Sequence, residues 1–143
     1  MQTELFLVDT SAWIFVLRKD FVPQIKDRVD SLLKENIILT TGIIKLELLG
    51  GTRTREEYLR LKSRLSVLDE VKTDSALWNA SFELAFSMRR KGITVPYTDI
   101  IIAVCAQSRN ATLIHADAHF NLISEHGDLQ IESYIDIATR RTT

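Results

Sequence analysis

The sequence predicts an α/β fold, a three-layer α/β/α sandwich around a central, mainly parallel sheet of four to five short strands. Short apolar runs alternate with longer stretches of helical periodicity, and no repeat or low-complexity linker interrupts the alternation. Acidic residues also stand where several of these runs begin or end. Because 143 residues with 45% hydrophobic composition suit one compact core, we expect a single domain over residues 1–143.

The first half of the chain contains two expected strands. The runs at residues 4–8 and 37–39 are short and mostly apolar, as in strands that helices cover on both faces. Helical periodicity fills the remainder. The expected elements are a strand at 4–8, helices near 11–18 and 22–35, a strand at 37–39, and helices near 42–49 and 54–66.

The second half continues the alternation toward a further strand at residues 112–115. Its large apolar residues at helical spacing favour packing in the core, and we expect Trp78, Phe82 and Phe120 there, together with Trp13. The expected elements are a brief segment at 67–71, helices near 74–91 and 98–108, the strand at 112–115, a helix at 117–124, an edge strand at 129–131 and a closing helix at 132–140.

Charge and composition restrict the possible partners. The formal net charge is −1, from 18 Lys and Arg against 19 Asp and Glu, so without the acids discussed below the surface is mildly basic. This balance permits a polyanionic partner without requiring one. The basic residues gather locally at Arg53 and Arg55, at Arg60, Lys62 and Arg64, and at Arg89, Arg90 and Lys91.

Neither a membrane span nor a signal peptide is expected. No apolar stretch reaches about 18 residues without charge, and no basic segment precedes an apolar one at the N-terminus. We therefore expect a cytoplasmic protein. The single cysteine, Cys105, lies in an apolar helical run and indicates a buried small side chain.

Asp9 ends the first expected strand and is followed by Thr10 and Ser11. One of the three is expected to cap the next helix. Three consecutive residues of this type exceed the need of one helix end, so a carboxylate flanked by hydroxyls is expected at the sheet edge.

Glu47 lies in the run at residues 43–49, where a helical wheel places it between Ile43 and Ile44 on an apolar face. A glutamate there is costly to desolvate unless it is paired or binds a metal. A solvated helix face is an equally weighted alternative, and a buried salt bridge to an arginine is the main competitor of metal binding.

Asp99 follows Thr98 and opens an almost wholly apolar helical run, which must be central to the fold. Its carboxylate is therefore expected to be buried, with the positive end of the helix dipole favouring ionisation. Capping explains one of Thr98 and Asp99, but not readily both.

Asp117 follows the strand at 112–115 and is a candidate helix cap. The neighbouring His115 and His119 suggest zinc, but no cysteine or third histidine is near and His115 belongs to the strand end. We therefore discount a zinc site.

Taken together, these segments resemble the PIN domain, a family of small metal-dependent ribonucleases, and within it the VapC-type toxins of bacterial toxin-antitoxin pairs. The segments that carry the resemblance are Phe6 to Trp13 (FLVDTSAW), Lys45 to Gly51 (KLELLGG), Pro96 to Ala103 (PYTDIIIA) and Ala116 to Phe120 (ADAHF). Their order, spacing and total length fit that family.

The resemblance implies a PIN-like fold in which Asp9, Glu47, Asp99 and Asp117 converge at one sheet edge and bind Mg²⁺ or Mn²⁺ as catalytic residues. Clustered carboxylates raise each other's pKa values unless cations compensate, and all-oxygen sites suit these two ions. The principal ligands are expected to be Asp9 and Asp99, with Glu47 as a ligand or as the holder of a water. The expected surrounding residues are Thr10, Ser11 and Thr98.

The resemblance also implies an endoribonuclease that hydrolyses RNA phosphodiester bonds, a cognate antitoxin that covers the site, and a homodimer. The helices near 42–49 and 54–66 are candidate partner surfaces. The leucines at helical spacing within them are more typical of a core, namely Leu48, Leu59, Leu61 and Leu65.

Three alternatives compete with this interpretation. The nearest is a PIN-like module that binds RNA or protein without cutting, against which the four retained acids argue. A receiver domain needs a paired acid early in the chain and a lysine after a late strand, and neither is evident. An aspartyl phosphatase needs a second aspartate two residues after Asp9, where Ser11 stands.

Overall fold

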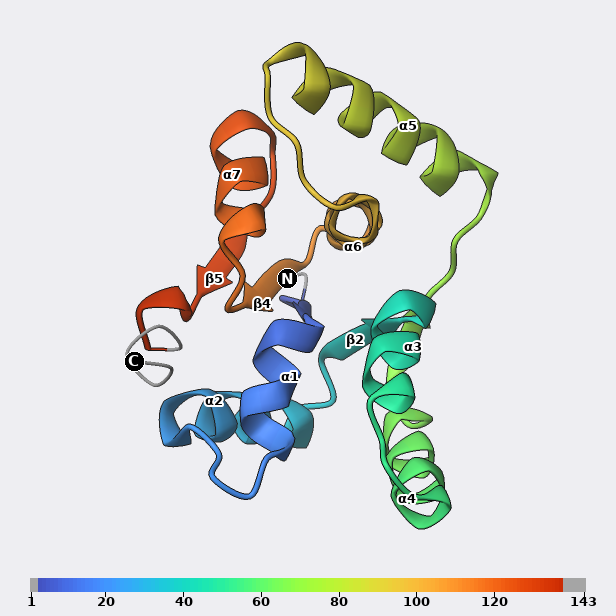
Figure 1. Cartoon of the computed structure of the whole chain (residues 1–143), viewed down its shortest axis with the longest axis vertical. Helices are drawn as coiled ribbons and strands as arrows, with labels where there is room; N and C mark the ends of the chain where they lie inside the picture. Colours follow the sequence, from blue (N-terminus) through green and yellow to red (C-terminus); the bar gives the residue numbers. More distant parts are fainter. Residues whose placement is uncertain (1–2, 138–143) are drawn as a thin grey trace.

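The computed structural model describes residues 3–137, and the predicted three-layer α/β/α arrangement is confirmed within them (Figure 1). The strands are β1 (Phe6–Val8), β2 (Ile38–Thr41), β3 (Asp69–Val71), β4 (Thr112–His115) and β5 (Ile131–Ser133). The helices are α1 (Thr10–Leu17), α2 (Pro23–Lys34), α3 (Gly42–Gly50), α4 (Arg55–Leu65), α5 (Ser75–Arg90), α6 (Tyr97–Ser108) and α7 (Ala118–His126).

The sheet has the strand order β3-β2-β1-β4-β5, and every neighbouring pair is parallel. Phe6 of β1 is in register with Ile38 of β2 on one side and with Thr112 of β4 on the other. The carboxyl ends of the strands therefore share one edge. The order reverses at β1, and ligand sites in open parallel sheets form outside that edge at such a reversal.

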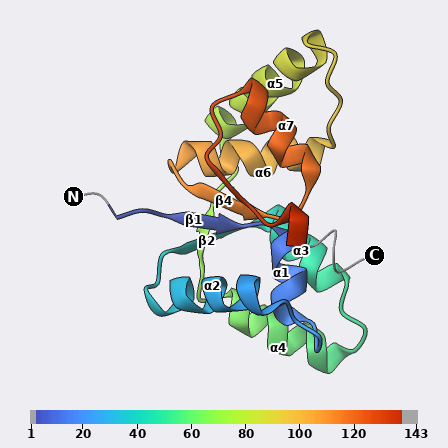
Figure 2. The same cartoon turned by 90° about the vertical axis from the view of Figure 1, so that its left-hand side faces the viewer.

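Helices cover both faces of the sheet. Figure 2 shows α5, α6 and α7 on one face, α1, α2 and α4 on the other, and α3 beside α1 near the carboxyl ends of the strands. All residues of β1 and β2 are buried, because strands enclosed on both faces need apolar side chains in both directions. Because helices cover both faces of the sheet, the strands of its centre appear in the sequence as short, mostly apolar runs.

The most buried helix is α6, as its sequence predicts. Ile102, Ala103, Cys105 and Ala106 have no exposed surface, so α6 lies between the sheet and α5 and α7. The expected burial of Cys105 is confirmed, and burial raises the pKa of its thiol to about 11. None of the helices in the described part of the chain is both long and apolar enough to cross a membrane.

The C-terminal elements differ from the prediction. The last strand is β5, two residues later than the expected strand at 129–131, because Leu129 is 5% exposed and packs into the core ahead of it. The expected closing helix at 132–140 is also wrong at its start, since 132 and 133 belong to β5. Residues 135–137 are helical, and 138–140 lie outside the described residues.

Two of the four aromatic residues expected in the core are exposed. Trp13 and Phe120 are buried at 4% and 0% exposure, but Trp78 and Phe82 on α5 are 41% and 62% exposed. Helical spacing reveals an apolar face without revealing what covers it, and the buried face of α5 uses Leu77 and Met88 instead.

The leucines of α3 and α4 divide in the same way. Leu48 and Leu65 are buried as expected and Leu61 is half-buried against the core, whereas Leu59 is 52% exposed. Only one side of α4 therefore packs against the domain.

Candidate metal centre

Four acidic residues lie at the carboxyl edge of the sheet. Asp9 directly follows β1, Asp117 follows β4 after one residue, Asp99 is the third residue of α6 and Glu47 lies in α3. Their charges interact, because Asp117, Asp9 and Glu47 all raise the pKa of Asp99. Segments separated by up to about a hundred residues in the chain are thus brought to one place.

Asp9 is held by Ser11. Its side chain caps α1, with Oδ2 accepting hydrogen bonds from the Ser11 backbone N–H at 2.9 Å and from Ser11 Oγ at 2.6 Å. Ser11 Oγ in turn accepts a hydrogen bond from the Ala116 backbone N–H at 2.9 Å, which ties the end of β1 to the end of β4. Burial nevertheless raises the pKa of Asp9, outweighing the hydrogen bonds from Ser11.

Glu47 is exposed, so of the alternatives that the sequence left open, the solvated helix face is the one observed. The buried side of α3 is narrow and consists of Ile44 and Leu48, and Glu47 stands at its border. Its carboxylate is oriented by Thr10, whose Oγ1 donates a hydrogen bond to Glu47 Oε1 at 2.8 Å. Thr10 and Ser11 therefore each hold one of the acids.

Asp99 is buried, with 8% exposure, but it does not cap α6. The cap position belongs to Pro96, and Thr98 is exposed, so the expected capping by Thr98 or Asp99 is wrong. Burial raises the pKa of Asp99 to about 7, and the neighbouring acids add to the shift. The expected stabilisation of its ionised form by the helix dipole is therefore outweighed.

Asp117 caps α7, with Oδ1 accepting a hydrogen bond from the His119 backbone N–H at 2.9 Å. His115 fixes the backbone of Asp117, because His115 Nδ1 accepts a hydrogen bond from the Asp117 backbone N–H at 3.1 Å. His115 is fully buried, and burial lowers its pKa to about 4, so it remains neutral at physiological pH.

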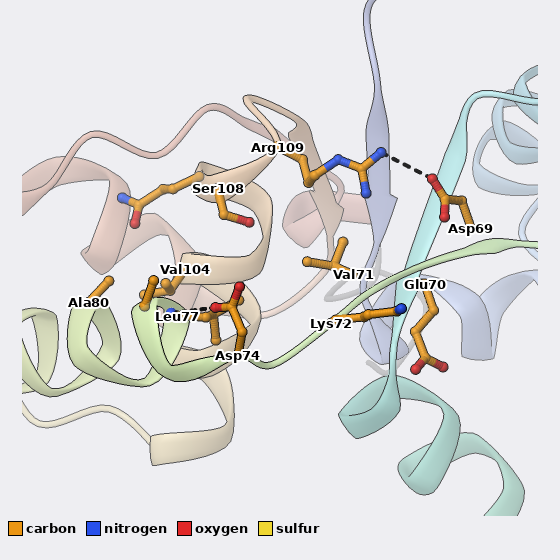
Figure 3. Close-up of a pocket in the computed structure, with 12 residues that line it drawn as sticks. Asp69, Glu70, Val71, Lys72, Asp74, Leu77, Ala80, Val104, Ser108 and Arg109 are labelled. Atoms are coloured by element: carbon orange, nitrogen blue, oxygen red, sulfur yellow. Dashed lines mark hydrogen bonds and ion pairs between the residues drawn. The ribbon is translucent and has the colours of Figure 1, made fainter.

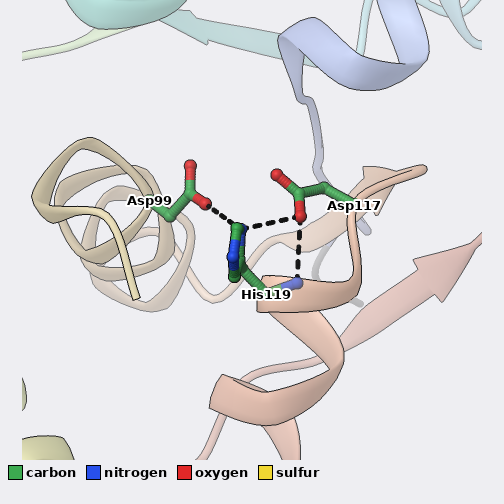
Figure 4. Close-up of side chains that lie close together, drawn as sticks. All are labelled: Asp99, Asp117 and His119. Carbon is green, nitrogen blue, oxygen red and sulfur yellow. Dashed lines mark hydrogen bonds and ion pairs between the residues drawn. The ribbon is translucent and has the colours of Figure 1, made fainter. Parts of the chain in front are cut away.

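His119 is the member of the site that sequence reasoning missed. Its Nδ1 lies 2.9 Å from Asp117 Oδ1 and 3.2 Å from Asp99 Oδ2, and Figure 4 shows the ring between the two carboxylates. The two histidines were considered only as zinc ligands. The available signal was the pattern Asp-Ala-His one residue after a strand, which places Asp117 at the N-cap of α7 and His119 in its first turn.

The donor atoms of this edge fit a divalent cation. Asp99 Oδ2 and His119 Nδ1 are buried and have no hydrogen-bond partner, which is costly unless a ligand satisfies them. Several carboxylates together also need compensating positive charge. One ligand atom from each of Asp99, Asp117 and His119 lies within 4.8 Å of the others, so these three residues could hold a cation, while Asp9 and Glu47 stay predicted ligands.

A separate hollow of about 680 Å³ lies at the other end of α6, lined by residues of β3, α5 and the last turn of α6 (Figure 3). Its acids have other partners: Asp69 pairs with Arg109 at 3.0 Å and Asp74 caps α5 by accepting from the Leu77 backbone N–H. The hollow is larger than a water-sized gap but lacks a group of converging unpaired donors, so the acidic edge remains the stronger candidate.

Comparisons with known proteins agree with this fold. The family model described as PIN domain matches residues 6–125. The chain is 27% identical over 125 residues to ribonuclease VapC21 of Mycobacterium tuberculosis, covering 85% of this chain and 88% of the relative. It is 29% identical over 135 residues to ribonuclease VapC11 of the same organism, covering 91% and 99%.

Solved structures show the same fold. A chain in the crystal structure of VapBC2 from Rickettsia felis, bound to a DNA fragment from their promoter, aligns with a TM-score of 0.76 at 22% identity, covering 91% of this chain and 98% of that one. A chain in the structure of FitAcB from Neisseria gonorrhoeae aligns with a TM-score of 0.70 at 17% identity, covering 89% and 96%.

Replacing Asp99 by Asn is expected to stabilise the metal-free protein at pH 8. The folded-state pKa of about 7 exceeds the unfolded value of 3.8, so the ionised carboxylate destabilises the fold above pH 7. We expect the free energy of unfolding in EDTA to rise by about 1 to 3 kcal/mol, with the difference shrinking toward pH 5, where folded Asp99 is protonated. The matched control is Asp27→Asn on the exposed face of α2. Urea unfolding of both variants measures the effect, and a less stable Asp99→Asn protein at pH 8 would contradict it.

Acidification is expected to destabilise the fold through His115, whereas protonation of Asp99 stabilises it. Its pKa of about 4 in the folded state lies below the unfolded value of 6.5, so stability is lost as pH falls from 6.5 toward 4. Between pH 8 and pH 5 this group costs about 2 kcal/mol. The His115→Asn variant keeps an acceptor for the Asp117 N–H and is expected to lack this loss in urea unfolding at the two pH values. An unchanged pH dependence would show that His115 is not the titrating group.

Proposed function

The chain belongs to the PIN domain family, and from this premise and the acidic edge we propose that it is a metal-dependent endoribonuclease and the toxin of a toxin-antitoxin pair. The single observation that carries the proposal is that two buried atoms, Asp99 Oδ2 and His119 Nδ1, make no hydrogen bond at the carboxyl edge of the sheet, where four acids meet. The relatives named as VapC ribonucleases support the same assignment.

Asp9 and Asp99 are the principal ligands of the cation in this proposal. Both are more than nine-tenths buried, and the position of each is fixed, Asp9 by Ser11 and Asp99 by the central helix α6. Asp117 adds a third carboxylate from the N-cap of α7. Mg²⁺ or Mn²⁺ suits such donors because both ions prefer oxygen ligands and retain waters that a substrate phosphate can replace.

A bound divalent cation supplies Lewis acidity at the scissile phosphate and lowers the pKa of an attacking water. Glu47 remains exposed at the open side of the site, oriented by Thr10, where it can accept a proton from that water. Ser11 keeps the ends of β1 and β4 together, so that Asp9 and Asp117 face the same substrate phosphate. Thr98 stands exposed beside Asp99, where it can contact the RNA backbone.

RNA is the substrate class that the surface favours. The negative charges of the acids that bind the cation are neutralised by it, so the rest of the protein surface is mildly basic. Arg89, Arg90 and Lys91 end α5, next to the loop that leads to Tyr97 at the start of α6. Basic residues on the surface favour a polyanion, and we expect the protein to act on RNA in the cytoplasm.

The competing function is a PIN-like module that binds RNA or protein without cutting. It would not need Asp9 and Asp99 as carboxylates, and it gives no reason to retain buried acids that destabilise the metal-free fold. The nuclease proposal explains both features.

A groove of about 430 Å³ between α1, α2 and α4 supports a cognate antitoxin as partner. Its lining includes Trp13, Leu33, Leu61 and Val67, of which Val67 is 76% exposed. An apolar groove flanked by the arginines of α4 is suited to an amphipathic segment with acidic residues. The antitoxin would also need a basic side chain to reach the acids from there.

The outer face of α5 supports a homodimer. Trp78, Phe82 and Phe86 follow one another at intervals of four residues and are 41%, 62% and 65% exposed. Aromatic residues that are widely exposed in one stripe are typical of an interface. The stripe is symmetric about Phe82, so an antiparallel copy would place Trp78 against Phe86 of the other copy and Asp74 near its basic end.

The nuclease proposal predicts metal-dependent cleavage of a mixed tRNA and ribosomal RNA substrate by purified, antitoxin-free protein. Asp9→Asn and Asp99→Asn are each expected to reduce the cleavage rate at least 100-fold, about 2.7 kcal/mol of activation free energy. EDTA should abolish cleavage, and the control Asp27→Asn should retain it. Circular dichroism verifies that the variants are folded. Absence of cleavage by folded, metal-loaded protein would favour the binding module.

The dimer proposal predicts that a charge at the centre of the stripe separates the copies. Phe82→Glu is expected to convert the dimer to a monomer in light scattering coupled to size exclusion, since two buried carboxylates would meet at the two-fold axis. The matched control is Leu46→Glu, which replaces a 70% exposed apolar residue on α3. An unchanged mass for Phe82→Glu, or a monomeric parent protein, would contradict this interface.

A further inference from the structure

His119 stands where a metal ligand would stand. One atom from each of Asp99, Asp117 and His119 lies within 4.8 Å of the others, in an arrangement that spans the first turns of α6 and α7. In Figure 4 the two carboxylates and the imidazole point toward one another. The three donors are two oxygens and one nitrogen, which differs from the all-oxygen site expected from the four acids.

The contacts within this group are close but are not hydrogen bonds. His119 Nδ1 lies 2.9 Å from Asp117 Oδ1 and 3.2 Å from Asp99 Oδ2, yet neither Nδ1 nor Asp99 Oδ2 has a partner with hydrogen-bond geometry. Asp99 is also more than nine-tenths buried, so water cannot readily satisfy it. Buried donors and acceptors are almost always satisfied, and a cation between these atoms would satisfy all three.

The separations suit octahedral coordination. With metal–ligand bonds of about 2.1 Å, neighbouring ligands of an octahedron lie about 3.0 Å apart, close to the two distances observed here. The group is also rigid, because Asp117 Oδ1 accepts from the His119 backbone N–H while Asp99 is fixed in the central helix. Little rearrangement is required for the three atoms to hold one ion.

We propose that His119 is a nitrogen ligand of the divalent cation at this edge, and that it gives the site a preference for Mn²⁺ over Mg²⁺. Imidazole binds first-row transition ions well, whereas Mg²⁺ prefers oxygen donors and retained waters. The inference rests on the proposed function, since the ion is the one that the nuclease site would hold.

The competing interpretation is that His119 is a counter-cation. An imidazolium between two carboxylates would neutralise them in the metal-free protein and would have to be displaced when a metal binds. The two interpretations predict opposite effects of removing the ring. Loss of a ligand weakens metal binding, whereas loss of a competing cation strengthens the binding of every divalent ion.

The test is direct metal binding by the full chain, measured by calorimetry with MnCl₂ and with MgCl₂. The parent protein is expected to bind Mn²⁺ at least about tenfold more tightly than Mg²⁺. His119→Ala should weaken Mn²⁺ binding by about tenfold or more and Mg²⁺ binding by less than about threefold. The matched control is His126→Ala, which removes an exposed histidine from the last turn of the same helix.

A spectroscopic measurement separates ligation from positioning. Electron spin-echo modulation from a directly bound ¹⁴N should appear in the Mn²⁺-loaded parent and in His126→Ala, and should be absent in His119→Ala. Equal losses of Mn²⁺ and Mg²⁺ affinity, tighter binding of both ions, or an absent nitrogen signal in the parent would each overturn the proposal. The nuclease function can fail independently of this inference. A protein that binds Mn²⁺ through His119 but cuts no RNA would contradict the nuclease function and leave the role of His119 as a ligand intact.

Discussion

The burial of Asp9 and Asp99 at one sheet edge, to which repulsion from the neighbouring acids adds, is the constraint on which the rest of this structure depends. Burial raises the pKa of Asp9, and burial together with Asp117, Asp9 and Glu47 raises that of Asp99 to about 7. A fold that brings these groups together loses stability when they ionise without a counter-charge. The parallel sheet imposes this arrangement, because its strands end at one edge and the helices that follow begin there. A divalent cation is the compensation that oxygen and nitrogen donors in this arrangement favour.

Much of the fold followed from the sequence because the local and the tertiary signals agree. Strands enclosed on both faces must be apolar throughout, so residues 4–8 and 112–115 were visible as short apolar runs. The placement of Asp9 and Asp117 followed from the same logic, since each comes at or just after a strand end and caps the next helix. The elements that depend on packing at the end of the chain were less visible, and β5 lies two residues later than predicted.

The errors share one physical cause, which is that periodicity shows an apolar face but not its neighbours. The helical wheel left open whether Glu47 is buried, and α3 in fact buries only a narrow stripe and leaves that carboxylate exposed. Trp78 and Phe82 were expected in the core, but they lie on the outer face of α5. His119 was set aside because a zinc site needs more ligands of its type, whereas its actual neighbours, Asp99 and Asp117, come together only in the folded chain.

Anomalous diffraction from crystals soaked in MnCl₂ would show whether this edge holds a divalent cation. One strong anomalous peak is expected between the carboxylates of Asp9, Asp99 and Asp117, within bonding distance of at least two of them. A fully occupied peak elsewhere, such as in the hollow lined by Asp69 and Asp74, or an acidic edge without a peak in crystals where Mn²⁺ has free access, would contradict it.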